Sequence, residues 1–388
     1  MSSFLTQCSS TGTTKTHHLF GCLVALAFLC LVIFSQSSEA DNLGIFFALM
    51  AISYLFVFSF FIYLWWAGQA LTAGFVLAWA GVFHLLGVLG APLFEDDYFR
   101  YLWDAYHTVQ FGSPYGVAPS EYFHDGGPGI NEHFQFILGQ INYPHIPTIY
   151  GPSLQYSFLL AYLIAPGEVW ALQLVYSLVD LVLIFILLKL APPSVVMLYA
   201  WSPLVFKEVI LTAHPDGLGI CLLMAAVLCT HRRYFYGAAM LLAASVAAKI
   251  FAVLFVPFLL VKSNPRHWLA FIAALLLLYV PLLSNQQSDL LGLAAMAKNW
   301  EFNSAFYGVL TIWFTAQQAK LILAIILFLC LAGYALGYCR PKFSLQPPRL
   351  TLNINDRVIR GDLIMGLFLL CAPVVNPWYL LWLLPFAV

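Results

Sequence analysis

Three consecutive acids, Glu95, Asp96 and Asp97, open a polar stretch in a mostly apolar chain, and Arg100 and Asp104 follow them in EDDYFRYLWD. In a helix that begins here, Arg100 would lie between Asp96 and Asp104, because residues four apart are neighbours. Glu95 and Asp96 would complement the positive end of the helix dipole. This structural interpretation assigns no role to Asp97. A carboxylate among aromatic side chains at the mouth of a membrane segment can also serve as a general base, and the residues alone leave both interpretations open.

Four later segments place polar and aromatic side chains at the ends of apolar runs. They are LTAHPDGLG with His214 and Asp216, SVAAKIFAV with Lys249, KNWEFNSAFYG with Trp300 and Glu301, and VNPWYLLW with Asn376, Trp378 and Tyr379. Each also has an ordinary interpretation: Lys249 would reach lipid headgroups, and Trp378 and Tyr379 would join an interfacial aromatic belt. If all four lie on the side of Asp97, they surround its carboxylate with cationic and aromatic groups.

The composition indicates which elements must position these groups. The 388 residues are 62% hydrophobic and only 9% charged, whereas soluble domains carry about 25% charged residues. The chain is therefore expected to be an all-α integral membrane protein, a polytopic bundle of helices in a single domain over residues 1–388. The eight cysteines form no Cys-x-x-Cys pair, which gives no support to a disulfide framework or a zinc site. Nucleic acid is not an expected partner.

A helical span needs about 20 apolar residues, and the sequence predicts about 11–13 spans. The predicted segments are 18–35, 44–66, 71–93, 168–190, 194–211, 216–230, 235–248, 250–262, 267–283, 317–338 and 361–375, with a last run at 378–388. The first is favoured as a retained helix over a signal peptide, because it lacks a strongly basic leading region. Segment 152–166 is short and bounded by prolines, so it is expected not to cross.

Positive charge sets the orientation of membrane proteins. The pairs Arg232/Arg233 and Lys262/Arg266 and the basic loop 339–360 are expected to face the cytoplasm, which leaves most of the 17 Asp and Glu outside. The large loop 94–167, after the third span, is then extracytoplasmic and is expected to contain short helices. A long ordered loop is usually functional.

The motifs of this loop resemble those of a known class. They are Asp97, Arg100, Tyr101, Trp103 and Asp104, then Gly112, Pro114 and Tyr115, then Tyr150, Pro152 and Leu154. The pattern is similar to that of the GT-C class of polytopic glycosyltransferases, especially bacterial polyprenol-phosphate-mannose-dependent mannosyltransferases, and the likeness covers about residues 90–388. Three residues depart from the family pattern: Ala105, Ser113 and Gly151. These departures bear on which substrate is bound more than on which fold is adopted.

The resemblance implies an inverting transfer of a hexose, with mannose favoured, from a polyprenyl-phosphate donor to a lipid or glycan acceptor. The reaction would take place at the extracytoplasmic face of the bacterial inner membrane, with membrane lipid as a partner. Asp97 is the expected general base and Asp96 the second candidate. Lys249 and His214, with Arg100 behind them, would stabilise the leaving phosphate. No cofactor and no metal are expected.

The same resemblance outlines a substrate pocket. Its expected members are Tyr101, Asp104, Tyr150, Asp216, Trp300, Glu301, Asn376, Trp378 and Tyr379. The alternative hypothesis is a transporter or flippase for a lipid-linked or anionic solute, using Asp180, Lys249 and His214. Transporters place such groups near the middle of the bilayer, whereas here most lie at one surface, and Asp180 is expected to bond a neighbouring helix. A third hypothesis is a structural envelope subunit that docks through its acidic loop.

Overall fold

A computed structural model describes most of the chain. The described residues are 10–11, 14–123, 129–260, 263–283, 287–339, 352–354 and 357–388. Of the cationic residues used above to orient the chain, Lys262, Arg340, Lys342 and Arg349 lie outside the described residues, so the predicted basic loop 339–360 is described only at its ends.

The described part of the chain is built from helices. The α-helices are α2 (Lys15–Ser35), α3 (Leu43–Ala67), α4 (Ala73–Val88), α5 (Tyr98–Phe111), α6 (Glu132–Gly139), α7 (Pro152–Ile164), α8 (Val169–Leu190), α9 (Pro193–Ala200), α10 (Pro203–Val205), α11 (Asp216–His231), α12 (Phe235–Ala248), α13 (Val256–Leu260), α14 (Pro265–Tyr279), α15 (Leu290–Asn299), α16 (Phe306–Leu310), α17 (Ala316–Cys339), α18 (Gly361–Cys371) and α19 (Leu384–Ala387). Four 3-10 segments are η1 (Pro119–Tyr122), η3 (Ile250–Phe255), η4 (Val280–Leu282) and η5 (Pro377–Trp382), and η2 (Phe206–Leu211) is a π-helix.

Strands play a small part in the described structure. β1 (Ser10–Thr11) pairs in parallel with β2 (Gln69–Ala70), and β3 (Leu352–Ile354) pairs in antiparallel fashion with β4 (Arg357–Ile359). These pairs join loops and form no layer of the fold. The architecture therefore rests on packed helices.

Six helical segments are long and apolar enough to cross a membrane. They are Lys15–Ser35, Leu43–Ala67, Val169–Leu190, Pro193–Leu211, Pro265–Leu282 and Ala316–Tyr338. Shorter apolar helices fall at Ala73–Val88, Asp216–His231, Phe235–Ala248, Ile250–Leu260 and Gly361–Cys371. The prediction of an all-α, polytopic membrane protein is confirmed. One predicted span, 250–262, is not a single α-helix, because η3 and α13 divide it.

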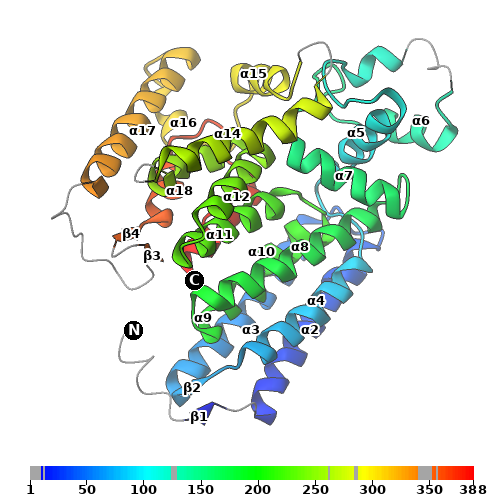
Figure 1. The fold of residues 1–388 in the computed structure, drawn as a ribbon. Coiled ribbons are helices and arrows are strands. Elements are labelled where there is room, and N and C mark those ends of the chain that lie inside the picture. The colour runs from blue at the N-terminus through cyan, green and yellow to red at the C-terminus, as the bar shows by residue number, and fades with distance from the viewer. Residues whose placement is uncertain are drawn as a thin grey trace.

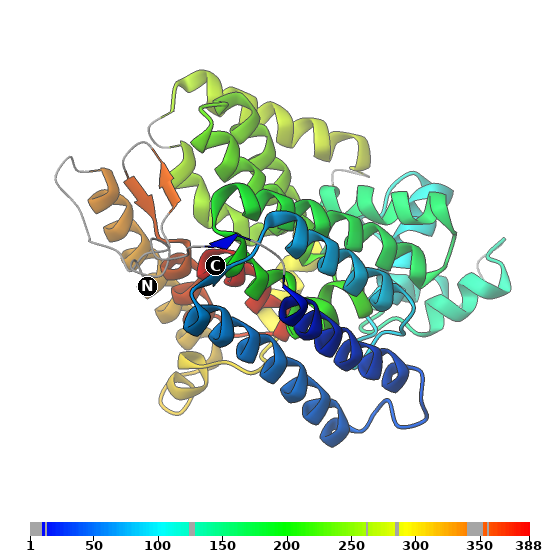
Figure 2. The ribbon, with the colours of Figure 1, turned by 90° about the horizontal axis from the view of Figure 1, so that it is seen from below.

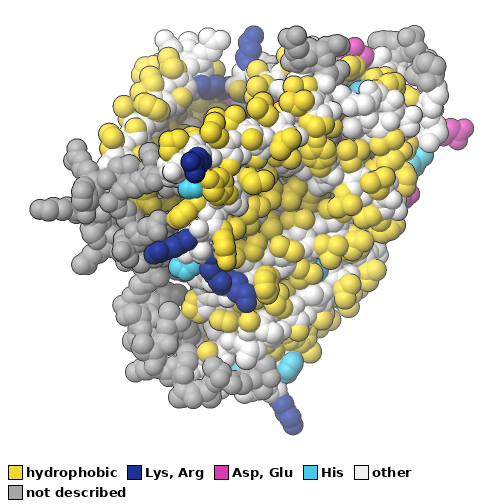
Figure 3. All heavy atoms as spheres, viewed as in Figure 1, with side chains coloured by type: hydrophobic (Ala, Val, Ile, Leu, Met, Phe, Trp, Pro, Cys, Tyr) yellow, Lys and Arg dark blue, Asp and Glu magenta, His cyan; other side chains and the backbone are white. Residues whose placement is uncertain are grey.

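The apolar helices pack side by side and leave large apolar side chains on the perimeter. Helices α2, α3, α4 and α8 run together along one side of the molecule, and α12 packs against both α11 and α14 (Figures 1 and 2). Leu55, Trp66, Leu277 and Phe328 are among many exposed apolar residues. A surface this apolar suits a lipid environment, and the space-filling view shows it as extended hydrophobic areas (Figure 3).

The carboxylate of Asp180, inside the bundle, is paired. Asp180 on α8 accepts a hydrogen bond from the hydroxyl of Tyr199 at 2.7 Å and lies 2.8 Å from Nε2 of His84 on α4. A buried carboxylate needs such partners, because it has lost its hydration. The prediction that Asp180 bonds neighbouring helices is confirmed, and its carboxylate is committed to this contact.

One end of the molecule carries the short helices of the predicted loop. Helices α5 and α6 lie there, with α15 beside them (Figure 1), and α7 packs against α5. The 13 residues of α7 are fewer than a span needs, and the expectation that segment 152–166 does not cross remains a prediction. Asp and Glu side chains gather at this end on the face shown in Figure 3.

Helix α7 begins at a very close approach between two segments. A Cβ atom on Gly151 would lie 2.1 Å from the carbonyl oxygen of Ala247 at the end of α12. This contact explains why glycine replaces the proline that is usual in the resembled motif. It also fixes Tyr150, the preceding residue, against the end of α12 and close to Lys249.

We expect Gly151→Ala to destabilise the fold, because the backbone of Ala247 cannot move aside cheaply. Overpacking of this kind costs about 1–3 kcal/mol. The measurement is the melting temperature in detergent by tryptophan fluorescence. The matched control is Gly74→Ala on α4, where an added Cβ meets nothing within 4 Å. Equal melting temperatures for the two variants would contradict the contact.

Candidate active site

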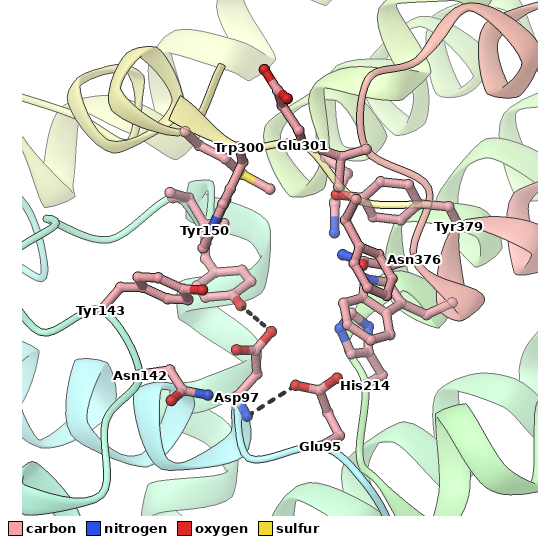
Figure 4. A pocket seen from close by; sticks show the side chains of 16 residues that line it. Glu95, Asp97, Asn142, Tyr143, Tyr150, His214, Trp300, Glu301, Asn376 and Tyr379 are labelled. Atoms are coloured by element: carbon pink, nitrogen blue, oxygen red, sulfur yellow. Dashed lines mark hydrogen bonds between the residues drawn. The ribbon is translucent and has the colours of Figure 1, made fainter. Parts of the chain in front are cut away.

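A cavity of about 260 Å³ lies at the end of the bundle that carries α5 (Figure 4). The residues that line it are Glu95, Asp97, Asn142, Tyr143, Ile149, Tyr150, His214, Lys249, Met296, Trp300, Glu301, Phe302, Val374, Asn376, Trp378 and Tyr379. In Figure 4, Tyr143 and Trp300 lie on one side, His214 and Asn376 on the other, and the Asp97 carboxylate between them. The cavity thus joins segments that are far apart in the sequence.

Asp97 stands at the cap position of α5 without using its side chain as a cap. Its carboxylate accepts a hydrogen bond from the Tyr150 hydroxyl at 3.2 Å, and its backbone N–H donates to the Glu95 carboxylate at 3.3 Å (Figure 4). Burial raises the pKa of the Asp97 carboxyl, while the charge of Lys249 and the Tyr150 hydroxyl oppose that rise. An acid in such a setting is suited to accept a proton.

Glu95 is a second carboxyl in the same cavity, and the sequence did not single it out for chemistry. Burial, and then the nearby charge of Asp97, raise its pKa to about 8. Lys249 and Tyr150 favour the ionised form of Asp97, whereas the pKa of Glu95 lies above neutral pH, so Glu95 keeps its proton there.

The opposite side of the cavity is organised by Asp216, which is fully buried. Its Oδ2 lies 2.8 Å from Nζ of Lys249 and 2.9 Å from Nδ1 of His214, and its Oδ1 accepts a hydrogen bond from Nε1 of Trp382 at 2.6 Å. A buried carboxylate is stable only with partners of this kind. Asp216 itself does not line the cavity but holds two residues that do.

Local breaks in the helices aim these two side chains. Lys249 has an extended backbone where α12 ends, and the chain continues as η3. His214 follows the π-helix η2 and Ala213, whose φ is +55°, and its backbone N–H donates to the carbonyl of Glu208 at 2.8 Å. Irregular helix geometry and strained residues are frequent at functional sites.

His214 is neutral in this setting. Burial lowers its pKa to about 4, although Asp216 opposes that change. The ring stacks on Trp378, with 4.3 Å between centroids and 27° between planes. Nδ1 lies 2.9 Å from the Asp216 carboxylate, although not in hydrogen-bond geometry. This neighbour favours a proton on Nδ1, which leaves Nε2 as an acceptor. Nε2 has no hydrogen-bond partner among the described residues.

Nine of the predicted site residues line the cavity, and the other five belong to the supporting structure. The first group is Asp97, Tyr150, His214, Lys249, Trp300, Glu301, Asn376, Trp378 and Tyr379. The second group is Asp96, Arg100, Tyr101, Asp104 and Asp216, none of which lines it. The catalytic and binding roles assigned to these residues remain predictions.

The predicted ion pair between Asp96 and Arg100 is wrong. Arg100 bonds Asp104 at 2.9 Å and donates to the carbonyl of Ile146 at 2.9 Å. Asp96 instead accepts a hydrogen bond from the side chain of Asn142. Arg100 lies buried along α5, so it supports the loop from behind the cavity.

Tyr101 and Asp104 are buried in the same supporting layer. Tyr101 stacks on Phe158 of α7 with 4.8 Å between centroids, and Asp104 accepts hydrogen bonds from Thr148 and from Gln155, the latter at 3.0 Å. These contacts bind α5 to α7 and to the preceding loop, and they fix the start of α5, where Asp97 lies.

The lining residues that the sequence did not predict are mostly loop residues. They are Glu95, Asn142, Tyr143, Ile149, Met296, Phe302 and Val374. Phe302 and Val374 meet because the backbone N–H of Phe302 donates to Pro373 and that of Val375 donates back to Phe302. Glu95 belongs to the acidic run and Phe302 to the segment KNWEFNSAFYG, both noted in the sequence, whereas no local pattern pointed to the other five.

The three consecutive acids also bear on the expectation that no metal binds. Glu95, Asp96 and Asp97 each offer one carboxylate oxygen, and these oxygens lie within 4.8 Å of one another. Carboxylates are suitable ligands for Mg²⁺ or Ca²⁺, although Asp96 is already bonded to Asn142. The absence of a metal requirement stays a prediction.

A second cavity, of about 720 Å³, adjoins the first. Its lining is mostly apolar and comes largely from α3, including Phe46, Met50 and Tyr54. Glu95, Phe302, Asn376 and Trp378 line both cavities, so they form the boundary between the polar and the apolar space. The ion pair of Lys207 and Glu208, with 3.1 Å between Nζ and Oε1, is in the wall of the apolar cavity.

A polytopic helical protein with a buried carboxyl, a lysine and a histidine around one cavity fits the class of membrane glycosyltransferases that the loop motifs indicated. Residues 30–264 match the model of the MptA_B family, described as alpha-(1->6)-mannopyranosyltransferase, N-terminal domain. The match covers more than half of the chain, and the chain belongs to this mannosyltransferase family. The predicted resemblance is confirmed. Comparisons with curated proteins and with solved structures found no match.

The raised pKa of Glu95 gives a pH-dependent prediction. Glu95→Gln replaces a protonated carboxyl by a neutral amide, so kcat/KM for mannosyl transfer at pH 6.5 should stay within roughly threefold of the original value. When Glu95 ionises at about pH 8, a second negative charge appears beside Asp97. The KM for an anionic mannosyl donor should therefore rise above this pH in the unsubstituted protein and not in Glu95→Gln.

The measurement is the pH dependence of the donor KM for both proteins between pH 6 and 9. The same rise in both would show that Glu95 is not the titrating group. A loss of activity in Glu95→Gln at pH 6.5 as large as that caused by Asp97→Asn would show that Glu95 must ionise for turnover.

Proposed function

We propose that this chain transfers mannose from a polyprenyl-phosphate carrier to a hydroxyl of a lipid or glycan acceptor. The transfer inverts the anomeric centre and uses Asp97 as the general base. The family description names an alpha-(1->6) product, and an α product formed with inversion requires a β-linked donor. The proposed site of action is the extracytoplasmic face of the bacterial inner membrane.

The observation that carries this proposal is the contact between a polar and an apolar cavity. A polyprenyl-phosphate sugar is polar at one end and a long hydrocarbon at the other. The cavity with Asp97 and Lys249 suits the sugar and phosphate, and the cavity lined by Phe46, Met50 and Tyr54 suits the chain. A nucleotide-sugar donor has no comparable hydrocarbon to bury, so the apolar cavity favours the lipid carrier.

The proposed reaction is a single displacement. The Asp97 carboxylate accepts the proton of the acceptor hydroxyl as its oxygen attacks C1 of the mannose. The bond between C1 and the phosphate oxygen breaks, and its electron pair leaves on the lipid phosphate. The hydrogen bond from Tyr150 orients Asp97. Tyr150 thus holds the carboxylate where it can take the proton of the acceptor hydroxyl.

Lys249 is the proposed partner of the leaving phosphate, because its ammonium lines the cavity and carries a positive charge. A preorganised cation stabilises charge that develops on a leaving group. His214 is neutral, and with its proton held toward Asp216 its Nε2 can accept a hydrogen bond from a sugar hydroxyl. This differs from the expectation that His214 donates directly to phosphate.

The distribution of charge supports the proposed orientation. Asp and Glu gather at the end of the molecule with α5 and α6 (Figure 3), and Arg232 and Arg233 lie exposed in the turn between α11 and α12. Arg266 follows the same pattern at the start of α14. The positive ends of polytopic proteins usually face the cytoplasm, which leaves the Asp97 cavity outside.

Asp97→Asn should lower kcat by about 10²–10⁴-fold, the usual contribution of a general base. The amide keeps the shape of the side chain but cannot accept the proton. Binding of the donor should change little, since Lys249 and the apolar cavity are untouched. The measurement is turnover of polyprenyl-phosphate-mannose by detergent-purified protein, with the product identified by mass spectrometry.

Asp96→Asn is the matched control, because it changes the neighbouring acid outside the cavity and should cost only a few-fold. Near-normal turnover by Asp97→Asn, or a larger loss in Asp96→Asn, would reject Asp97 as the base. Transfer from GDP-mannose but not from the lipid donor would reject the proposed donor.

Cysteine labelling tests the orientation. In a variant whose native cysteines are replaced by alanine, an impermeant thiol reagent applied from the periplasmic side should label Glu132→Cys and not Arg232→Cys. Both positions are exposed, so accessibility from the aqueous phase decides the result. The opposite pattern would place the Asp97 cavity on the cytoplasmic side.

A further inference from the structure

An aromatic pair forms one wall of the cavity and takes no part in the proposed chemistry. The rings of Tyr143 and Trp300 lie 4.7 Å apart between centroids and are nearly perpendicular, at 86°. The two residues come from separate loops, and both line the same cavity as Asp97. Figure 4 shows them on the side opposite His214 and Asn376.

The loop that carries Tyr143 is held in place on both sides. The carbonyl of Pro144 accepts a hydrogen bond from the backbone N–H of Ser120 at 2.9 Å, and the carbonyl of Ile146 accepts one from Arg100 at 2.9 Å. Half of the Tyr143 side chain stays exposed. The ring is thus fixed in position without being packed into the core.

The loop that carries Trp300 is fixed as firmly. Lys320 donates to the carbonyls of Ala297 and Lys298, both at 3.0 Å, and Phe302 exchanges backbone hydrogen bonds with the segment around Val374. Helix α15, which precedes this loop, packs directly against the loop that carries Tyr143. A Cβ on Gly292 would lie 2.5 Å from the carbonyl oxygen of Pro147.

Tyr143 also has a strained backbone, with φ at +51°. A bulky residue adopts this left-handed conformation at a cost in free energy, and such strain is kept where a function needs the orientation it gives. An interfacial aromatic belt would not require it, because belt residues lie on the lipid-facing perimeter. Trp66 and Trp313 are largely exposed and line neither described cavity.

We propose that Tyr143 and Trp300 form the subsite that binds a sugar ring of the acceptor, next to the hydroxyl that attacks. This rests on the proposed function and assigns the acceptor to the glycan class. The C–H face of a pyranose is apolar and weakly positive, so it stacks on the electron-rich face of an aromatic ring. Two perpendicular rings give a corner that fixes both the position and the tilt of a sugar.

Polar groups beside the corner suit the hydroxyls of such a ring. Asn142 and Glu301 line the cavity next to Tyr143 and Trp300, and they offer an amide and a carboxylate. Asn142 is also bonded to Asp96, so the subsite is tied to the acidic segment that carries Asp97. The acceptor ring would then lie on one side of Asp97 and the donor phosphate, near Lys249, on the other.

The test compares a variant that removes the aromatic ring of Trp300 with one that keeps an aromatic ring at this position. Trp300→Ala should raise the KM for an octyl α-1,6-linked dimannoside roughly tenfold, as expected for loss of a buried aromatic contact, and Trp300→Phe should recover much of it. The donor KM should change far less than the acceptor KM, because Lys249 and the apolar cavity are untouched. Trp313→Ala, an exposed tryptophan outside the cavity, is the matched control.

A second measurement separates this proposal from the proposed function. Saturation-transfer NMR with α-1,6-linked mannotriose should detect binding to the unsubstituted protein and to Asp97→Asn, and not to Trp300→Ala or Tyr143→Ala. Failure of donor turnover together with trisaccharide binding would reject only the proposed function. An unchanged acceptor KM in Trp300→Ala, an equal change in Trp313→Ala, or no trisaccharide binding would overturn the subsite.

Discussion

The buried carboxylate of Asp216 is the constraint on which the site depends. It is fully buried, and a charge without water must be paired and hydrogen-bonded. Its partners Lys249, His214 and Trp382 come from three different segments. Asp216 therefore joins α11, the break after α12 and the C-terminal η5. Two of its partners line the cavity, and Trp378, in the same 3-10 segment as Trp382, stacks on His214.

This pairing has a chemical consequence under the proposed function. Asp216 and Lys249 neutralise each other, and His214 is uncharged, so the cluster as a whole has no net charge. A free ammonium in an apolar surround would hold the lipid phosphate product tightly and slow its release. Lys249 shared with Asp216 can lean toward the phosphate as charge develops there and return afterwards, which favours the transition state over the product.

Much of the fold follows from the apolar runs, because a span of about 20 apolar residues has few alternatives to a helix. The pairing of Asp180 was also predictable, since an isolated carboxylate in such a span needs a partner. The division of segment 250–262 was not, because the extended backbone of Lys249 depends on its bond to Asp216, 33 residues earlier. A contact between distant segments leaves no local pattern in the sequence.

The site residues were also difficult to predict from local sequence patterns. Asp97 was favoured for chemistry because the pairing of Asp96 with Arg100 assigned it no structural role, but that pair does not form. Arg100 bonds Asp104 and the carbonyl of Ile146 instead. The error comes from extending helical spacing to residues that precede the helix, which begins at Tyr98. Tyr143 was missed because nothing in a turn-rich stretch indicates which side chain faces a cavity.

The direction of each acid follows once the start of α5 is known. Residues in a helix at adjacent positions point about 100° apart, but Glu95, Asp96 and Asp97 lie before it and are free to diverge. Asp96 does not line the cavity and bonds Asn142. Asp97 lines the polar cavity, and Glu95 lines both the polar and the apolar one. A carboxyl that stands at this boundary is costly to ionise, which is why Glu95 keeps its proton at neutral pH. The three acids thus take three places: Glu95 is a protonated group at the boundary of the two cavities, Asp97 faces the polar cavity, and Asp96 bonds the loop at Asn142.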